Sequence, residues 1–124
     1  MSVSGKVAIV SGAAGGLGRA MAIRLAEEGC KVLGFDVQKE VLDVPGITGM
    51  VADVSKRGDV ESVVAKASGM GAIGVLVNNA GTWRKTPVES PWQQALDDWD
   101  FIMDTNLKGV MMLSRAVVPH LQKD

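Results

Sequence analysis

Four short apolar runs along the chain are each followed by turn-forming or polar residues. They span residues 6–10, 31–35, 48–52 and 72–77, and the first is rich in β-branched residues. Short apolar runs bounded by turn residues are typical of strands buried in a parallel sheet. The pattern therefore predicts four strands, of which the third is the weakest.

Stretches of helical period separate these runs. Residues 16–28 carry Leu17, Met21 and Leu25 at four-residue spacing, which predicts a helix that ends at Gly29. Residues 38–46 have the composition of a turn, and Ser55 can cap a second helix. One face of that second helix is apolar and is formed by Val60, Val63, Val64 and Ala67.

The last third of the chain predicts a loop followed by one long helix. Two prolines interrupt residues 82–96, and Asp97 and Asp98 then suit the start of a helix because they complement its macrodipole. Three tryptophans around this junction are expected to pack the loop: Trp83, Trp92 and Trp99. The helix carries a stripe that is apolar except at one position, formed by Ile102, Asn106, Val110, Leu113 and Val117.

Strands that alternate with helices predict an α/β fold, in which right-handed crossovers give a Rossmann-type, doubly wound parallel sheet. The length fits a single domain over residues 1–124. Ligands bind such sheets outside the carboxyl ends of the strands. Here those ends are Ser11-Gly12, Asp36, Asp53 and Asn78-Asn79-Ala80-Gly81, which are residue types that bind nucleotides.

The glycine-rich segment at residues 11–18 joins the first strand to the first helix. Glycines allow a tight turn and let a pyrophosphate approach the N-terminus of a helix. The spacing is neither GxGxxG nor that of a P-loop. The alternative is a turn of small residues that only packs the helix on the strand, but the strand before it and the helix after it favour phosphate binding.

Asp36 follows the second strand, 18 positions after Gly18. A carboxylate there can accept hydrogen bonds from the adenosine ribose of a dinucleotide and would repel a 2′-phosphate. Its neighbours Phe35 and Val37 are uncharged, which favours NAD over NADP, whereas Lys39 argues for the opposite preference. The alternative for Asp36 is an ordinary carboxylate at a strand end.

Composition excludes several classes of protein. Lys and Arg number 13 and Asp and Glu 14, so no positive excess exists to bind nucleic acid or an acidic membrane. A single cysteine and a single histidine exclude an internal disulfide and a Cys/His zinc site, and the carboxylates at 97, 98 and 100 are interpreted as a helix-start charge cluster rather than a metal site. No apolar run approaches the about 20 residues of a membrane span, so we expect a cytoplasmic protein.

Together these fragments resemble the short-chain dehydrogenase/reductase family over essentially the whole chain. The segment from Ser11 to Gly18 matches the family's Thr-Gly-x-x-x-Gly-x-Gly with Ser for Thr, and residues 78–81 match its Asn-Asn-Ala-Gly. Asp53-Val54 matches the pair whose carboxylate receives the adenine amino group. The resemblance implies a sheet order of 3-2-1-4 and NAD as the cofactor. It implies these cofactor-binding residues: Ser11, Gly12, Gly16, Leu17, Gly18, Asp36, Asp53, Val54, Asn78, Ala80 and Gly81.

Asn106 matches the Asn of the family's Asn-Ser-Tyr-Lys tetrad, which implies a catalytic role in holding a water that connects the catalytic Lys to solvent. Asn106 also falls on the apolar stripe of its helix. A buried amide without partners costs about 1–3 kcal/mol, so we expect it to form hydrogen bonds. The alternative is a buried Asn that holds a neighbouring backbone group.

The chain departs from the family at its end. Family members continue with a catalytic Ser and a Tyr-x-x-x-Lys helix, whereas this sequence contains no tyrosine and stops at Asp124. We therefore expect an incomplete, NAD-binding half of an oxidoreductase that moves hydride between NAD(H) and an alcohol or ketone, inactive by itself. The fourth strand then forms a sheet edge and the long helix is partly uncovered, which favours a homo-oligomer. The alternative is a non-catalytic dinucleotide-binding module or partner subunit.

Overall fold

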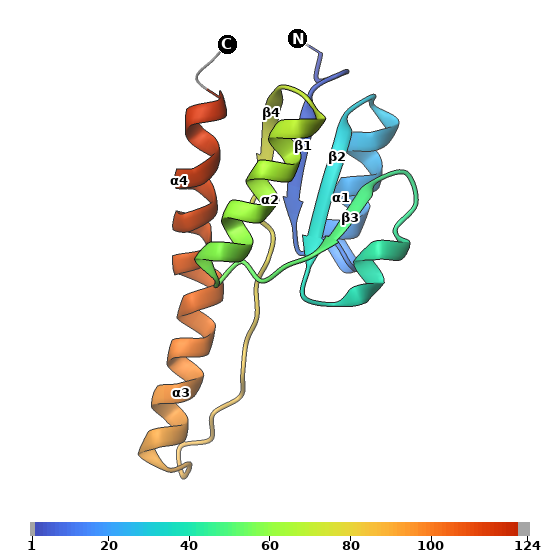
Figure 1. Cartoon of the computed structure of the whole chain (residues 1–124). Helices are drawn as coiled ribbons and strands as arrows, with labels where there is room; N and C mark the ends of the chain where they lie inside the picture. Colours follow the sequence, from blue (N-terminus) through green and yellow to red (C-terminus); the bar gives the residue numbers. More distant parts are fainter. Residues whose placement is uncertain (1, 122–124) are drawn as a thin grey trace.

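A four-stranded parallel sheet forms the centre of the molecule (Figure 1). The computed structural model describes residues 2–121. The strands are β1 (Val7–Ser11), β2 (Lys31–Asp36), β3 (Thr48–Val51) and β4 (Ile73–Val77), in the order β3-β2-β1-β4. The predicted fold class and strand order are confirmed, and each predicted strand lies within one residue of its observed bounds.

Helices cover both faces of this sheet, as Figure 1 shows. Helix α1 (Gly16–Glu27) packs on one face, whereas α2 (Arg57–Met70) and α4 (Gly109–Leu121) pack on the other. Alternate residues of β1 therefore enter two separate cores: Val7 and Ile9 join the core under α2 and α4, and Ala8 and Val10 join the core under α1. All four side chains are fully buried, which explains why the strand is apolar from Val7 to Val10 without alternation.

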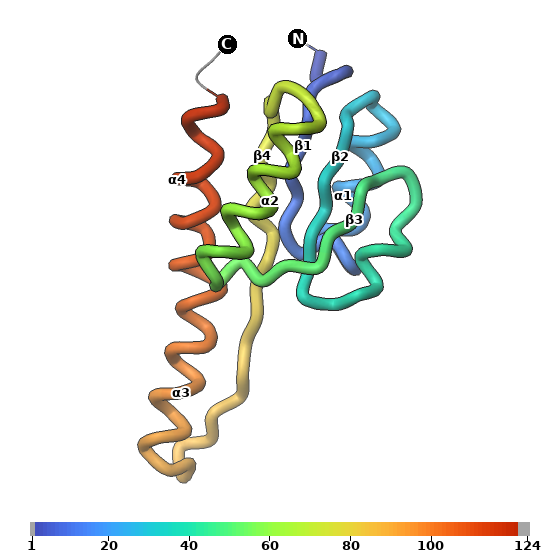
Figure 2. Tube along the Cα trace, in the orientation of Figure 1, coloured from blue at the N-terminus to red at the C-terminus, as the bar shows by residue number. Residues whose placement is uncertain are grey.

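The chain leaves the sheet after β4 and returns as one long helical rod, visible in the tube of Figure 2. The rod consists of α3 (Trp92–Met103), a π-helical segment η2 (Asp104–Lys108) and α4. The α3 end and the loop before it project beyond the strand ends. This part of the fold places two helical segments next to the carboxyl ends of the strands.

The predicted start of the long helix was wrong. The helix begins at Trp92 rather than Asp97, so the acidic residues lie inside it. Pro91 is the N-cap residue of α3, and a proline has no N–H to donate within a helix. It therefore marks the start of the helix better than the acidic pair does. The tryptophans do not pack the loop: Trp83, Trp92 and Trp99 are each more than 60% exposed, at 77%, 83% and 61%.

Three further local predictions need correction. Helix α1 buries Gly18 and Ala22, whereas Leu17 is 69% exposed, because the helix approaches the sheet through its smallest residues. Ser55 does not cap α2, which starts at Arg57 after Lys56. The predicted turn at residues 38–46 contains the 3₁₀ segment η1 (Lys39–Asp43). The predicted apolar face of α2 is confirmed, since all four of its residues are buried.

In the part of the chain that the structure describes, no helix is both long and apolar enough to cross a membrane.

Candidate functional site

A pocket of about 460 Å³ lies at the carboxyl ends of the strands. Its size is within the range of small-molecule sites. All four strand-end loops contribute to it, and the helical rod supplies two more residues. The lining consists of Gly12, Gly15, Phe35, Asp36, Val37, Gln38, Ala52, Asp53, Val54, Ser55, Asn79, Ala80, Gly81, Thr82, Phe101 and Thr105.

Ser11 joins the ends of β1 and β4 beneath this pocket. Its hydroxyl donates to the Val77 carbonyl oxygen at 3.3 Å and accepts from the backbone N–H groups of Asn79 and Ala80, each at 2.9 Å. The residue is 1% exposed. Ser11 was predicted among the cofactor-binding residues, but its side chain is buried under the loop and holds residues 79 and 80, which line the pocket.

Glycines let the first and fourth strand-end loops touch. A Cβ on Gly18 would collide with the Gly12 carbonyl oxygen and with Asn79 Nδ2. Gly12 has a φ of +66°, and a Cβ there would lie 3.0 Å from Ala80 Cα. Asn79 Nδ2 donates to the Gly12 carbonyl at 3.2 Å. Gly18 therefore shapes the loop without lining the pocket itself.

The N-terminus of α1 opens beside the pocket. Gly15 is the N-cap residue, no side chain caps the helix, and its first turn contains no acidic residue. A Cβ built on Gly15 would meet nothing within 4 Å, so the space above this backbone is open. Gly16, which has a φ of +56°, and Leu17 form the first turn but do not line the pocket.

Asp36 connects the glycine-rich loop to the end of β2. Its Oδ2 accepts from the Ala14 N–H at 3.1 Å and its Oδ1 accepts from the Gln38 N–H at 3.1 Å. The carboxylate lines the pocket and retains lone pairs on both oxygens. Its position therefore permits contacts with a ligand while it also orders two loops.

Asp53 is held at the end of β3. Its Oδ1 accepts from the N–H of Ser55 at 2.9 Å and from the hydroxyl of Ser55 at 2.6 Å, and its own N–H donates to Asp59 at 2.8 Å. Gly109 of α4 packs against this loop, where a Cβ would lie 2.8 Å from Val54 Cγ1. The Asp53-Val54 loop is thereby fixed between two helices, and the role of Gly109 was not predicted.

Asn106 lies in the π-helical segment and contacts the loop after β4. Its Oδ1 accepts from the Thr82 N–H and its Nδ2 donates to the Thr82 carbonyl, both at 2.7 Å. The expectation that Asn106 is buried was wrong, because the residue is exposed: η2 sits where the rod projects past the sheet. It forms the expected hydrogen bonds, and they hold a backbone group.

The predicted cofactor-binding residues divide into two groups. Those that line the pocket are Gly12, Asp36, Asp53, Val54, Ala80 and Gly81. Ser11, Gly16, Leu17, Gly18 and Asn78 lie outside the lining, and Asn78 donates instead to the Ser114 hydroxyl at 3.1 Å. The lining residues that sequence reasoning missed include Thr82 of the loop after β4, Phe101 of α3 and Thr105 of η2. No cluster of metal-ligating side chains occurs among residues 2–121.

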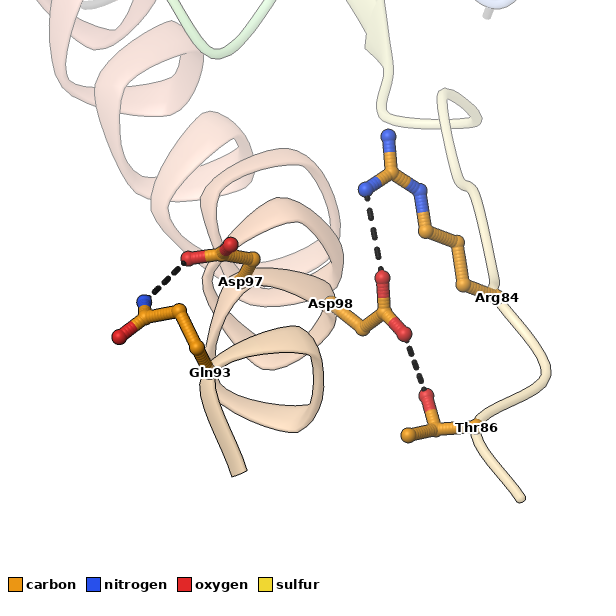
Figure 3. A network of polar contacts seen from close by, with 5 residues as sticks. All are labelled: Arg84, Thr86, Gln93, Asp97 and Asp98. Atoms are coloured by element: carbon orange, nitrogen blue, oxygen red, sulfur yellow. Dashed lines mark hydrogen bonds and ion pairs between the residues drawn. The ribbon is translucent and has the colours of Figure 1, made fainter. Parts of the chain in front are cut away.

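A polar network anchors the loop that follows Thr82 (Figure 3). Asp98 of α3 accepts from the Thr86 hydroxyl at 2.7 Å and pairs with Arg84 Nη1 at 3.4 Å. Arg84 also lies over the ring of Phe101, 3.5 Å from its centroid. Asp98 was predicted to belong to a helix-start charge cluster, but it lies inside the helix and is buried.

Comparison with known proteins decides the family. The family model of short chain dehydrogenases matches residues 6–124. The chain belongs to the short-chain dehydrogenase family. Its membership explains why four strand-end motifs occur in one order along the sequence and meet in one pocket.

Individual short-chain dehydrogenase relatives match this chain over almost its whole length. It is 37% identical to a 3-oxoacyl-(acyl-carrier-protein) reductase of Thermotoga maritima, covering 99% of this chain and 53% of the relative. It is 33% identical to the 2-dehydro-3-deoxy-D-gluconate 5-dehydrogenase of Escherichia coli, covering 96% and 49%. The chain thus spans about half the length of these curated relatives.

A solved structure gives the same fold. The 3-ketoacyl-(acyl-carrier-protein) reductase of Brucella melitensis, crystallised in complex with NADH, superposes with a TM-score of 0.86 at 34% identity. The match covers 98% of this chain and 52% of the other. The short-chain dehydrogenase fold is therefore shared across the described residues.

Proposed function

We propose that this chain is the dinucleotide-binding part of a short-chain dehydrogenase that transfers hydride between NAD(H) and an alcohol or ketone. The observation that carries the proposal is the pocket at the strand ends, which the loops of all four strands enclose. Family membership and the NADH-bound reductase from Brucella melitensis support the same class of ligand. We further propose a cytoplasmic homo-oligomer.

The glycine-rich loop fits a pyrophosphate. Free backbone N–H groups at a helix N-terminus attract anions, and here neither a side-chain cap nor an acidic residue competes for them. The open space above Gly15 leaves room for phosphate oxygens to approach the backbone. In this proposal the backbone of the loop, rather than its side chains, would bind the pyrophosphate at Gly12, Gly16, Leu17 and Gly18. The Ser11 hydroxyl would support the loop from below.

Two carboxylates favour NAD as the nucleotide. Asp36 would accept hydrogen bonds from the ribose hydroxyls and Asp53 from the adenine amino group, beside Val54. The described pocket lining contains both acidic side chains and neither Lys nor Arg, so a 2′-phosphate would meet repulsion without compensation. Lys39, which had argued for NADP, is exposed in η1 and lies outside this lining.

The side chains available for chemistry are limited. NAD supplies the hydride acceptor when it is bound, and this chain's residues would bind and orient it. Asn78, Ala80 and Gly81, which follow β4, would form and support the side of the pocket on which the dinucleotide lies. Asn106 would act as a positioning residue, since both groups of its carboxamide are engaged by Thr82. The sequence holds no tyrosine to serve as the family's general acid, so we expect no turnover by residues 1–124.

Equilibrium titration tests this proposal. The 124-residue chain should quench or shift NADH fluorescence saturably and bind NADPH more weakly. Asp36→Asn, which keeps an oxygen acceptor but removes the charge, should narrow the preference for NADH over NADPH. Asp43→Asn, an exposed carboxylate outside the pocket, serves as the matched control. A folded chain that binds neither nucleotide would contradict the proposal, and an unchanged preference in Asp36→Asn would contradict the role of the charge.

A further inference from the structure

Asp98 is a buried carboxylate that the dinucleotide pocket itself does not use. Its side chain is 9% exposed, and each of its oxygens has a partner from the loop before α3. Oδ2 accepts from Thr86 at 2.7 Å and Oδ1 lies 3.4 Å from Arg84 Nη1. Burying a charge is costly unless the charge is paired and hydrogen-bonded. The loop therefore supplies the hydrogen bond and the ion pair that the buried Asp98 carboxylate needs, and Asp98 in turn holds the loop in place.

The adjacent carboxylate shows the contrast. Asp97 points to the other side of α3 in Figure 3, where it is exposed and accepts from Gln93 of the same helix at 2.8 Å. That contact joins two residues one turn apart and ties no other segment to the helix. The two carboxylates are adjacent in the sequence and belong to the same helix, but of the two only Asp98 contacts the loop.

Arg84 extends this network to the pocket. Its guanidinium lies 3.5 Å from the centroid of the Phe101 ring, in the geometry of a cation–π contact. Phe101 follows Asp98 by three residues, so both side chains lie on the same side of α3 and the arginine can meet both. Phe101 lines the pocket, as does Thr82, two residues before Arg84.

The loop has little else to hold it. Across residues 83–91 of the described chain, the backbone hydrogen bonds outside helices and strands are a turn bond from Ser90 N–H to the Pro87 carbonyl and a bond from Ala95 N–H to the Pro91 carbonyl at the start of α3. Thr82 is held by Asn106 at one end, and α3 begins at the other. Side-chain contacts with Asp98, together with the contact between Arg84 and the Phe101 ring, thus attach the intervening loop to α3.

We propose that Asp98 is a positioning residue for the nucleotide pocket. Through Thr86 and Arg84 it clamps the 83–91 loop on α3, and the clamped arginine holds the Phe101 ring as the pocket wall opposite the strand-end loops. This inference rests on the proposed function, because the wall matters only if the pocket binds a nucleotide. A clamp that served stability alone would change the melting temperature and leave the affinity of the folded protein unchanged.

NADH titration of the 124-residue chain, paired with thermal melts, tests the clamp. In Asp98→Asn the dissociation constant for NADH should rise by a factor of about 2 to 30, the range for substitutions that act on a site without touching its ligand. Asp97→Asn should bind NADH as the wild type does. Thr86→Val and Thr86→Ser give a second pair, since valine keeps the shape and serine keeps the hydroxyl. Thr86→Val should weaken binding, and Thr86→Ser should recover most of the loss.

A double-mutant cycle tests the path through the ring. If the clamp acts on Phe101, then Thr86→Val should add little to the loss caused by Phe101→Leu, whereas independent effects would add. Wild-type chain that is folded and fails to bind NADH overturns the proposed function and this inference together. Wild-type binding with an unchanged affinity in both Asp98→Asn and Thr86→Val overturns the clamp alone. If Asp98→Asn does not fold, the NADH affinities of Thr86→Val and Thr86→Ser decide whether the clamp acts on the pocket.

Discussion

The carboxamide of Asn106 pairs with the backbone of Thr82 as one peptide group pairs with another. It accepts from the Thr82 N–H and donates to the Thr82 carbonyl, each at 2.7 Å. The π-helical turn around Asn106 carries one more residue per turn than its neighbours, and such turns often occur at functional sites. The side chain thereby joins the helical rod to the loop after β4 at the pocket.

We expect Asn106→Ala to lower the free energy of unfolding by about 1 kcal/mol, because two hydrogen bonds at an exposed site are lost and water replaces them. Denaturant unfolding measures this change. Lys108→Ala, on the same π-helical segment and also exposed, should alter stability by less than about 0.5 kcal/mol. Equal losses in the two variants would contradict the structural role of the Thr82 contact.

Ser11→Ala should lower the stability of the protein more than Asn106→Ala does, although it removes only one oxygen atom. The hydroxyl serves three partners in a fully buried position, and its loss leaves the N–H groups of Asn79 and Ala80 without an acceptor. We expect a loss of about 1–3 kcal/mol in the free energy of unfolding.

A comparable hydroxyl on the surface provides the control for Ser11. Ser62 bonds the Gly58 carbonyl within α2 and is exposed, so Ser62→Ala should be close to neutral. Chemical denaturation of both variants measures the difference. A Ser11→Ala variant as stable as Ser62→Ala would show that the two amide groups find other partners.

The strands and the position of the site could be predicted from the sequence because they depend on local pattern and topology, whereas the strand order was implied by the family resemblance. Four apolar runs bounded by turn residues identify the sheet, and parallel strands bring their carboxyl ends to one edge. The face of α1 could not be predicted in this way. Periodicity favours Leu17, which is exposed, as well as Leu25, which packs partly buried on the core, whereas the residues that α1 buries are Gly18 and Ala22.

The wall contributed by α3 depends on tertiary contacts that no local pattern reports. Asp98 resembles a helix-start residue in the sequence, and its burial follows only from the loop that folds back with Arg84 and Thr86. Phe101 and Thr105 line the pocket because of where the helical rod passes the strand ends. Family resemblance supplied Asn106, although not its contact with Thr82.

Two glycines of the glycine-rich segment at residues 11–18 should respond differently to substitution by alanine. In Gly18→Ala the new Cβ would collide with the Gly12 carbonyl oxygen and Asn79 Nδ2, so we expect a loss of about 1–3 kcal/mol in stability. In Gly15→Ala the Cβ meets open space and the extended backbone, with a φ of −162°, accepts any residue. That variant should fold normally but bind NADH more weakly, because the methyl group occupies the approach to the helix N-terminus.

Melting curves and NADH titrations of the two variants separate these effects. Reduced binding in Gly15→Ala with an unchanged melting temperature identifies the space above Gly15 as part of the nucleotide site. Full NADH affinity in Gly15→Ala would place the pyrophosphate elsewhere. A stable Gly18→Ala would show that α1 can move away from the β1 loop.

Burial of the Cys30 thiol should make the stability of the protein depend on pH. Burial, with a smaller contribution from the negative charge of Glu28, raises the pKa of the Cys30 thiol, whose S–H donates to the Val3 carbonyl at 3.5 Å. The native protein then keeps this proton to higher pH than the unfolded chain does. Stability from this source is complete below the unfolded pKa of about 8.5 and falls as the pH rises through the native pKa.

Two measurements on Cys30 test this loss of stability with rising pH. The free energy of unfolding should fall in the wild type as the pH rises above the unfolded pKa of a cysteine, and less steeply in Cys30→Ala, which has no thiol to titrate. Alkylation at pH 8 should be slow in the native protein and fast in denaturant, because the thiolate is the reactive form and burial suppresses it. Rapid alkylation of the native chain, with the two pH profiles superimposed, would mean that the N-terminal segment at Val3 opens readily and leaves Cys30 accessible.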